Sequence, residues 1–459
     1  MHHDIKAVID RGMCIGCGAC SVATSGAVPV TLGPYRVYQA DTDGLDEETL
    51  QRASSVCPFS DDSRNEDELG PPTSSARSLP HDPRLGRVGR VLVGRRTDEG
   101  ELRKSSSGGI TSWLLEALLT SGSIDGIVHV GQSQGPELFT QGVSSDVATA
   151  NAKRKSIYYA TTMTEAIDQI RHTDLRYAIV GVPCYITAAR HLAAADPDLA
   201  ERLAYFVGIV CGHLKSQFFA ESLAWQVGVE PDDLVEVDFR VKDPSRPASD
   251  YRFGARGRND TALRTAPTQK LFGGNWGIGA FQPEACNFCD DIFAETADIV
   301  LGDAWLPEFQ HDWRGTNIIV TRNHELDVIL DQGRASGDLE LQTVSADDAA
   351  SSQAGNFRHR RDGLAVRLAD DIEAGVSVPR KRVTPGTDHV TEKRRRLIRQ
   401  RRKMSALSLR LFAAARAAGD HDLYLRPMRR EFRKYRSIDR PFRHRVLGRV
   451  KRTIADRLR

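Results

Sequence analysis

The stretch Cys14-Ile-Gly-Cys17-Gly-Ala-Cys20 decides the first part of the fold, and Cys57, which precedes Pro58, brings a fourth thiol. Cysteines spaced by two residues, with glycines between them, let a tight loop surround three corners of an iron–sulfur cluster, while a remote Cys-Pro supplies the fourth ligand. The spacing therefore predicts one [4Fe–4S] cluster. Zinc is the alternative ligand for four cysteines, but zinc sites usually present two C-x₂-C pairs.

Residues 1–60 are expected to form a ferredoxin-like module around these cysteines. The segments V-P-V-T-L at 28–32 and Y-R-V-Y at 35–38 have the composition of short strands. Two-cluster ferredoxins contain a second C-x₂-C-x₂-C run. Only one such run occurs here, so the module is expected to have lost its second site. A polar stretch without apolar period then predicts a linker at 61–85.

The segment 86–345 alternates short apolar runs with helical patterns, which is typical of an α/β domain with a mixed sheet. The chain has 459 residues, enough for two or three domains. Helices are expected at 110–119, 187–194 and 216–227. Strands are expected at 88–94, 126–130, 177–182, 205–210, 234–241, 298–302 and 317–321.

A strongly basic segment ends the chain. Residues 380–459 contain 27 Lys and Arg against 7 Asp and Glu, a net charge of +20, which leaves −18 for the rest. We expect 346–459 to be a basic helical extension that packs on the acidic body or on a partner subunit. Its charge also suits an acidic partner, nucleic acid or a membrane surface. Aromatic residues are interleaved with its arginines: Phe412, Tyr424, Phe432, Tyr435 and Phe442.

No run of about 18 apolar residues predicts a transmembrane helix, and the first residues do not resemble a signal peptide. The expected location is therefore the cytoplasm, with the basic extension allowing contact with a membrane surface. In such a reducing compartment, the eight cysteines favour metal or redox chemistry over disulfides.

The other four cysteines are dispersed. Cys184 and Cys211 follow two apolar segments, and Cys286 and Cys289 form a C-x₂-C pair. Loops at strand ends are where α/β domains place their sites. Either of the first two alone fits a core cysteine, but the count of four indicates a second [4Fe–4S] cluster.

The segment Lys104-Ser-Ser-Ser-Gly108-Gly109-Ile-Thr111 lies between an expected strand and an expected helix. Hydroxyl groups, glycines and free N–H groups at a helix start suit a phosphate or pyrophosphate. The same composition also fits a simple helix cap.

The order of the motifs resembles the beta-subunit family of coenzyme F420-reducing hydrogenase, which also includes F420-linked dehydrogenase subunits and chlorophyll-pathway reductases. The resemblance begins with the ferredoxin-type run and covers about residues 10–330. It does not include the basic extension. It rests on S-x-S-G-G-I at 105–110, K-S-x-Y at 155–158, G-x-P-C at 181–184, C-x-x-C at 286–289 and A-D-I-x-x-G-D-A-W at 297–305.

The resemblance implies a flavoprotein in which FAD lies beside a [4Fe–4S] cluster. It makes the dispersed cysteines the ligands of that cluster: Cys184, Cys211, Cys286 and Cys289. It makes the following residues candidates for FAD binding: Lys104, Ser105, Ser107, Gly108, Gly109, Thr111, Lys155, Tyr158, Asn275 and Asp303.

The sequence after Cys211 departs from the hydrogenase subunits, which suggests a distinct subgroup. His213 and Lys215 are therefore candidate catalytic residues, as a proton donor and an anion contact. A structural role is the alternative for both.

Taken together, the sequence predicts an oxidoreductase that passes electrons from ferredoxin or a partner subunit through two [4Fe–4S] clusters to FAD. The acceptor is expected to be coenzyme F420 or another organic molecule. Two alternatives are a non-catalytic electron-transfer subunit and a binding protein with structural metal sites.

Overall fold

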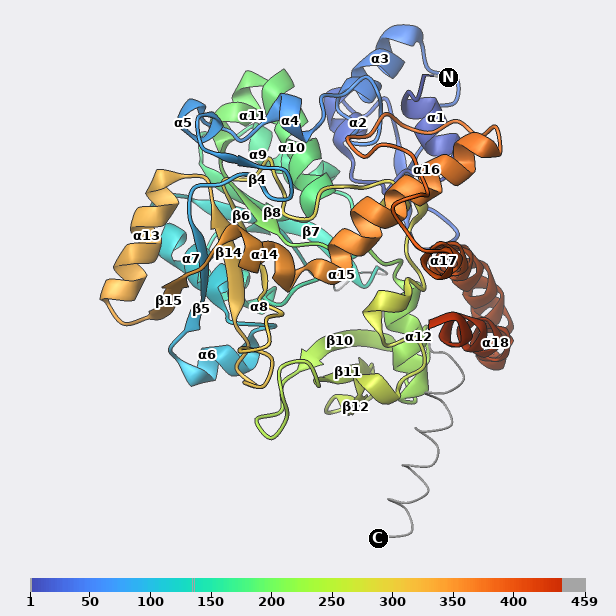
Figure 1. The fold of residues 1–459 in the computed structure, drawn as a ribbon. Helices are drawn as coiled ribbons and strands as arrows, with labels where there is room; N and C mark the ends of the chain where they lie inside the picture. The colour runs from blue at the N-terminus through green and yellow to red at the C-terminus, as the bar shows by residue number, and fades with distance from the viewer. Residues whose placement is uncertain (1, 134, 136, 440–459) are drawn as a thin grey trace.

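An eight-stranded mixed sheet forms the centre of the computed structural model, which describes residues 2–133, 135 and 137–439 (Figure 1). Phe442 lies outside the described residues. Strands β6, β8, β9 and β13 are parallel neighbours, and antiparallel strands flank them on both sides. The strands are, in sheet order, β15 (Leu339–Thr343), β5 (Val91–Arg96), β14 (Asn317–Thr321), β13 (Ile299–Asp303), β9 (Leu203–Ile209), β8 (Tyr177–Gly181), β6 (Gly126–Gln132) and β7 (Phe139–Ser144).

The predicted mixed α/β sheet is therefore confirmed. Helices cover both faces of the sheet and bury separate apolar cores against it. These helices are α6 (Glu99–Lys104), α7 (Ile110–Thr120), α8 (Val147–Ala152), α9 (Thr164–Arg171), α10 (Pro183–Ala195), α11 (Pro197–Arg202) and α13 (His324–Ala335).

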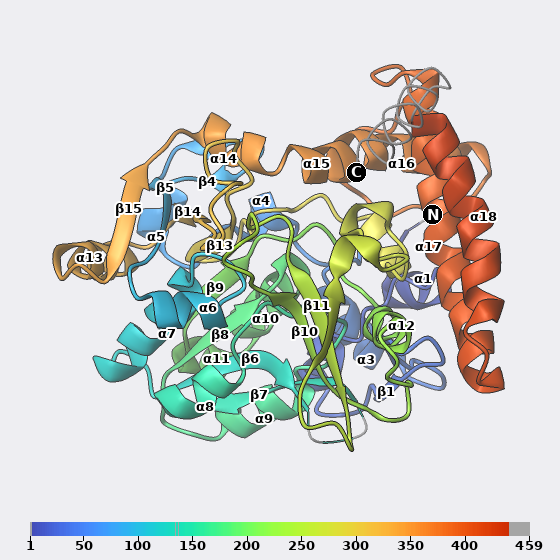
Figure 2. The same ribbon diagram turned by 90° about the horizontal axis from the view of Figure 1, so that it is seen from below.

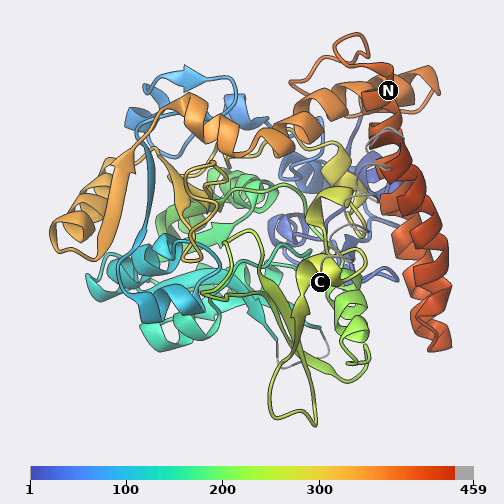
Figure 3. The ribbon, with the colours of Figure 1, turned by 60° about the horizontal axis from the view of Figure 1, so that its bottom comes forward.

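A second, three-stranded antiparallel sheet lies beside α12 (Phe218–Gln226) (Figure 3). Its strands are β10 (Leu234–Val241), β11 (Arg252–Gly257) and β12 (Arg264–Pro267). The segment 234–241 forms the expected strand, but it pairs outside the large sheet. Three short 3₁₀ turns follow: η1 (Thr268–Lys270), η2 (Trp276–Ile278) and η3 (Glu284–Asn287).

The N-terminal module contains the two expected short strands, which pair in antiparallel fashion. Its elements are α1 (Ile5–Asp10), α2 (Ala19–Ala23), β1 (Val30–Leu32), β2 (Tyr38–Ala40) and α3 (Glu47–Ser55). The module has a small core of its own, and other apolar side chains join the core beneath the large sheet. Its ferredoxin-like character stays a prediction.

The predicted linker at 61–85 is more ordered than its composition suggests. It forms α4 (Glu66–Leu69), α5 (Ser74–Arg77) and β3 (His81–Asp82), and β4 (Gly86–Arg87) follows it. A capping box between Asn65 and Glu68 starts α4, and Leu69 is buried. Local caps and a few apolar anchors therefore order a segment without any apolar period.

The described part of the C-terminal extension runs across the molecule and includes two long helices that pack against each other (Figure 2). Met404, Phe412, Tyr424 and Met428 bury these helices against the aromatic core around α12. Its elements are α14 (Ala346–Ser352), α15 (Ala354–Phe357), the π-helical turn η4 (Arg358–Asp362), α16 (Gly363–Glu373), α17 (Glu392–Ala418) and α18 (Asp422–Asp439). No helix in the described part of the chain combines the length and apolar character needed to cross a membrane.

Candidate functional site

The first thiol set is wrapped by the turn before α2. Cys14, Cys17, Cys20 and Cys57 line one small, almost wholly apolar hollow. The N–H groups of Gly16 and Ala40 point at Cys14 Sγ, at 3.4 and 3.3 Å. Backbone N–H groups directed at sulfur stabilise a metal-bound thiolate and tune the reduction potential of an iron–sulfur cluster.

The second thiol set forms at the carboxyl edge of the large sheet. Cys184 lies in the first turn of α10, directly after β8, and Cys211 follows β9, the parallel neighbour of β8. Cys286 and Cys289 approach from the turn η3, and the N–H of Leu214 points at Cys286 Sγ at 3.3 Å. Neighbouring parallel strands end at the same edge, which explains how dispersed cysteines meet.

Tyr185 lies between the two thiol sets. It follows Cys184 in the chain, and its hydroxyl group lies 3.5 Å from the carbonyl oxygen of Ile15 in the first thiol loop. The hydroxyl group accepts from the N–H of Thr161 at 2.8 Å and donates to the carbonyl of Thr161 at 2.6 Å. The N–H of Met163 donates to the carbonyl of Cys17 at 2.9 Å. The two thiol sets are therefore adjacent, and the segment 161–163 joins them.

Burial raises the pKa of every one of the eight thiols, for example to about 12 for Cys17 and to about 11 for Cys289. The thiols stay protonated at neutral pH unless a cation replaces the protons. All eight cysteines are free of disulfides. This chemistry and the N–H···S contacts fit metal-bound thiolates, and zinc remains the alternative to iron–sulfur clusters.

Three cavities share Ser156 as a lining residue. Two of them include chain neighbours of the second thiol set: Tyr185 lines the first, and Val210 and Gly212 line the second. The sheet-edge cavity, of about 140 Å³, reaches from Thr111 to Tyr185 and Leu214. The aromatic cavity, of about 430 Å³, lies between Tyr158 and Trp305. The basic cavity, of about 540 Å³, is lined by these cations: Arg103, Lys104, Arg154, Lys155 and Arg240.

Buried polar atoms without a partner indicate that the sheet-edge cavity binds a polar ligand. The amide of Gln141 and the hydroxyl groups of Tyr159 and Thr161 have no hydrogen-bond partner within the described residues. All three side chains are at most 5% exposed and line this cavity. Buried polar groups are rarely left unpaired, so a bound molecule with complementary groups fits here.

The start of α7 forms one end of the sheet-edge cavity. Gly109 begins the helix at φ 76° and has no side chain to cap it. The amide of Asn317 accepts from the N–H of Ile110 at 3.1 Å, which leaves the next N–H groups of the first turn for a ligand. Because a helix N-terminus attracts anions, this end suits a phosphate.

Most of the candidate FAD residues line one of these cavities. Those that line the sheet-edge cavity are Ser105, Ser107, Gly109, Thr111, Lys155 and Tyr158. Lys104 is on the rim of the basic cavity and bonds Glu101, while Gly108 is buried against Gly94 and Asn317. Asp303 pairs with Arg240 at 2.7 Å and lines the aromatic cavity.

Asn275 is exposed and caps η2 by accepting from the N–H of Gly277 at 2.8 Å. It lines none of the three cavities described above.

Lys155 adopts φ 84°, a backbone conformation that is strained for a residue with a side chain. Strain of this kind often occurs where a loop is shaped around a ligand.

His213 and Lys215 are both buried, and neither lines one of the three cavities. His213 stacks on Trp276, with the ring centroids 5.1 Å apart. Lys215 Nζ donates to the carbonyl of Ala280 and lies over the rings of Phe219 and Trp276. Desolvation lowers the pKa of both groups well below their ordinary values. Their catalytic role stays a prediction, and this geometry favours a structural one.

Sequence reasoning missed several residues of the site. Gln141 belongs to β7, a strand that the apolar pattern does not predict, although a polar residue on the buried face of F-T-Q-G-V-S is a usable signal. Thr161 and Tyr185 carry no motif. Their importance depends on the approach of the N-terminal module, which only the tertiary structure shows.

His129 lines the sheet-edge cavity, and its burial can be tested by the pH dependence of the free energy of unfolding. It bonds Ser144 at 2.9 Å, and desolvation lowers its pKa from 6.5 to about 4. The unfolded chain therefore binds the proton more readily, so stability falls as the pH drops from 6.5 toward 4. We expect His129→Asn to remove a slope of up to about 1.4 kcal/mol per pH unit in this window. Urea unfolding of the apoprotein at several pH values measures it, and equal slopes in both proteins would contradict the expectation.

Two buried four-thiol sets near a cavity with polar atoms unpaired among the described residues are compatible with a class of proteins that bind metal or redox cofactors. The comparisons with known proteins agree with this class. Two models of the coenzyme F420 hydrogenase/dehydrogenase beta-subunit family match this chain. The model of that subunit's N-terminal part matches residues 91–168, and the model of its C-terminal part matches residues 174–347. The chain belongs to this family, which implies a role in redox electron transfer.

One curated relative is a subunit of the F(420)H(2) dehydrogenase of Methanosarcina mazei, and it is 26% identical over 222 residues. The match covers 45% of this chain and 55% of the relative, so the chain spans about half the length of that protein. A chain of the F420-reducing [NiFe] hydrogenase complex from Methanosarcina barkeri aligns over 65% of this chain and 98% of its own length, at 18% identity and a TM-score of 0.49.

Proposed function

We propose that the protein is an iron–sulfur flavoprotein oxidoreductase that holds two [4Fe–4S] clusters and FAD. One observation carries the proposal: Tyr185 follows Cys184 in the chain, approaches the Ile15 carbonyl group of the first thiol loop at 3.5 Å, and lines the sheet-edge cavity. When bound, the clusters transfer single electrons and the flavin transfers electron pairs, so the series converts one into the other.

The residues around the sheet-edge cavity fit FAD. The start of α7 and Ser107 offer N–H and hydroxyl groups to a diphosphate. Lys155 and Arg154 line both the sheet-edge and the basic cavity. Asp238 pairs with Lys155 and Glu101 pairs with Arg154, and these pairs hold the two cations at the cavity wall as hydrogen-bond donors for a ligand. Val182 and Leu214 close the opposite end beside the second thiol set. A ligand that fills this cavity therefore lies next to those cysteines.

The aromatic cavity is the candidate site for the organic acceptor. It shares Tyr158 and Tyr159 with the sheet-edge cavity, so an acceptor there lies next to a flavin. Trp276 and Trp305 provide flat apolar walls, and the Arg240–Asp303 pair provides charge. Coenzyme F420 is the acceptor suggested by the family, and a different organic molecule is the alternative.

The electron donor is proposed to be ferredoxin or a partner subunit that docks near the first thiol set. Cys14 and Cys57 are partly exposed, whereas Cys17 and Cys20 are buried. The Methanosarcina mazei relative is named as one subunit of a dehydrogenase, which supports a partner chain. Location in the cytoplasm and contact of the basic extension with a membrane or an acidic partner stay predictions.

Anaerobic purification with cofactor analysis tests the proposal. A brown-yellow protein with about eight iron atoms, as two [4Fe–4S] clusters contain, and one FAD per chain supports it. A colourless protein that contains zinc would contradict it. Reduction of F420 or a dye by the isolated chain separates an enzyme from a non-catalytic electron-transfer subunit.

Gln141→Leu tests the sheet-edge cavity. The amide of Gln141 is buried without a partner among the described residues, so its removal takes away a hydrogen bond to the ligand. We expect FAD to bind about tenfold more weakly, which corresponds to about 1.4 kcal/mol. Fluorescence titration of the apoprotein with FAD measures this change.

Gln226→Leu is the matched control. The amide of Gln226 is satisfied by Phe272 and Ser222, and the residue lines none of the three cavities. It should leave FAD affinity unchanged. Equal affinities of the Gln141→Leu variant and the parent protein would place FAD elsewhere.

A further inference from the structure

The C-terminal extension contributes a cation to the second thiol set. The matched family segment ends at residue 347, and the turn η4 lies beyond it. This turn is a π-helix, a rare conformation that is frequent at functional sites. It directs the side chain of Arg360, which is 1% exposed, toward the thiols.

Arg360 makes three contacts there. Its Nε donates to the carbonyl of Gly212 at 2.7 Å, and Nη1 donates to the carbonyl of Cys289 at 3.2 Å. Nη2 lies 3.8 Å from Cys211 Sγ. The guanidinium group therefore touches two of the three loops that carry the second thiol set.

A buried guanidinium group is costly unless negative charge faces it. No carboxylate forms an ion pair with Arg360 within the part of the chain that the structure describes. Its nearest potential anions are the sulfur atoms of the second thiol set, and Nη2 lies 3.8 Å from Cys211 Sγ. Protonated thiols carry no charge, whereas four thiolates around an iron–sulfur cluster make the whole site anionic. The position of Arg360 is thus explained by a negatively charged second site.

We propose that Arg360 tunes the second site by raising the reduction potential of the cluster held there. The inference rests on the proposed function, because it requires a cluster at this site. Reduction adds one electron from the donor to an anionic site, and no bond is formed or broken. A cation in contact with that site stabilises the reduced form more than the oxidised form.

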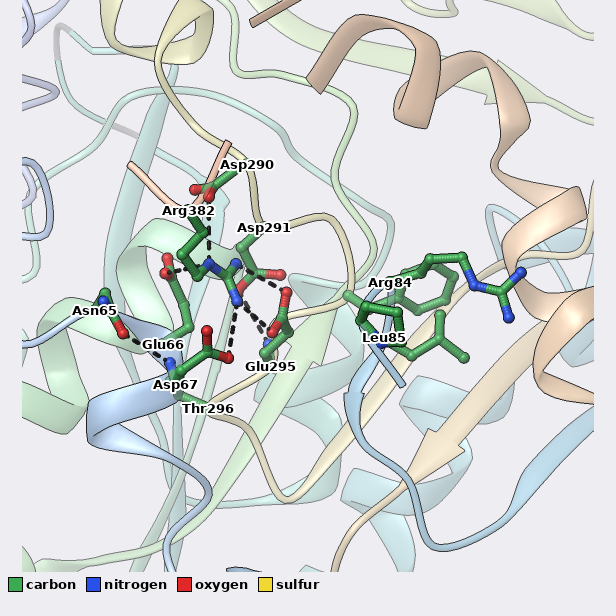
Figure 4. Close-up of polar contacts among 12 residues, drawn as sticks. Asn65, Glu66, Asp67, Arg84, Leu85, Asp290, Asp291, Glu295, Thr296 and Arg382 are labelled. Atoms are coloured by element: carbon green, nitrogen blue, oxygen red, sulfur yellow. Dashed lines mark hydrogen bonds and ion pairs between the residues drawn. The ribbon is translucent and has the colours of Figure 1, made fainter. Parts of the chain in front are cut away.

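Other basic residues of the extension fix the loop that Arg360 contacts. Arg367 Nε donates to the carbonyl of Asn287 at 2.8 Å. Arg382 lies between the carboxylates of Asp290 and Glu295, at 3.2 and 2.7 Å (Figure 4). These contacts hold the loop at Asn287, next to Cys286, and at Asp290, directly after Cys289. Arg360 therefore contacts a loop that is anchored on both sides of Cys289.

The test is a redox titration of the anaerobically loaded full chain, followed by electron paramagnetic resonance. Arg360→Gln removes the charge and keeps hydrogen-bonding capacity. We expect it to disfavour the reduced form of the second cluster by at least about tenfold, a shift of about 59 mV to lower potential. Arg360→Lys should stay near the parent value. The first cluster is the internal reference and should not move.

Arg367→Gln is the matched control for loop anchoring, because Arg367 is also buried and bonds the backbone carbonyl groups of Asn287 and His359 rather than a sulfur atom. It should shift the potential of the second cluster by less than Arg360→Gln does. Iron content accompanies every titration. Unchanged potentials in a fully loaded Arg360→Gln variant overturn the inference alone. Loss of the second cluster in both Arg360→Gln and Arg360→Lys shows a purely structural role and also overturns it. A parent protein without a second cluster overturns the proposed function as well.

Discussion

Cys286→Ser is expected to lower bound iron from about eight atoms to about four per chain and to abolish electron delivery to the flavin. Cys286 belongs to the second thiol set, which lies between the first set and the sheet-edge cavity. Serine does not replace a thiolate as a ligand of equal softness. The remaining cluster should still be reduced by dithionite, while flavin reduction from the donor side falls to background.

Cys14→Ser is the complementary variant, because Cys14 belongs to the first set. It should also halve the iron content but leave the cluster beside the flavin. Metal analysis, the visible spectrum and electron paramagnetic resonance distinguish the two variants. A Cys286→Ser protein that keeps about eight iron atoms would show that Cys286 is not a ligand. Zinc in place of iron in the parent protein would favour structural metal sites.

Gly18→Ala is expected to disrupt the first thiol site. Gly18 has φ 88°, and a Cβ atom there would lie 2.3 Å from Thr164 Oγ1 and 2.5 Å from Thr162 Oγ1. Threonine hydroxyl groups sit close to their backbone and cannot swing away, so the loop between Cys17 and Cys20 must move. We expect loss of the first cluster and destabilisation by about 2–5 kcal/mol, from the left-handed backbone and the overlap together.

Gly12→Ala separates these two causes. Gly12 also has positive φ, at 64°, but a Cβ atom there meets nothing within 4 Å. It should cost only about 1–2 kcal/mol for the left-handed backbone and keep the cluster. Iron content and thermal unfolding of both variants give the comparison. Similar losses in the two variants would mean that close packing against residues 162–164 is unimportant.

Local sequence patterns predict many of the strands of this fold. Apolar runs predict β6, β8, β9, β13 and β14 to within a few residues, because strands buried on both faces of a sheet are almost continuously hydrophobic. Edge strands such as β7 and β15 are not predicted, since polar residues alternate in them. The pairing of 234–241 outside the large sheet also escapes prediction, because strand composition does not specify a partner.

The candidate site is predictable only where residues are close in sequence or belong to a recognised motif order. Cys14, Cys17 and Cys20 form one loop, and the structure brings Cys57 to them. The meeting of Cys184 and Cys211 follows from neighbouring strands, as the motif order implies. Arg360 could not be found in this way, because R-H-R-R within a basic extension resembles any solvated charge run. Its significance depends on a contact across 149 positions of the chain.

The late position of the extension in the chain has a consequence for biosynthesis. All eight cysteines leave the ribosome before Arg360 and Arg382 do. During that interval the second thiol set has its four cysteines but lacks the arginine that contacts Cys211 and Cys289 and the one that pairs with Asp290. The contacts of the extension with this set therefore form only after the set itself has been synthesised. A chain that stops before the extension contains all eight cysteines but none of these contacts.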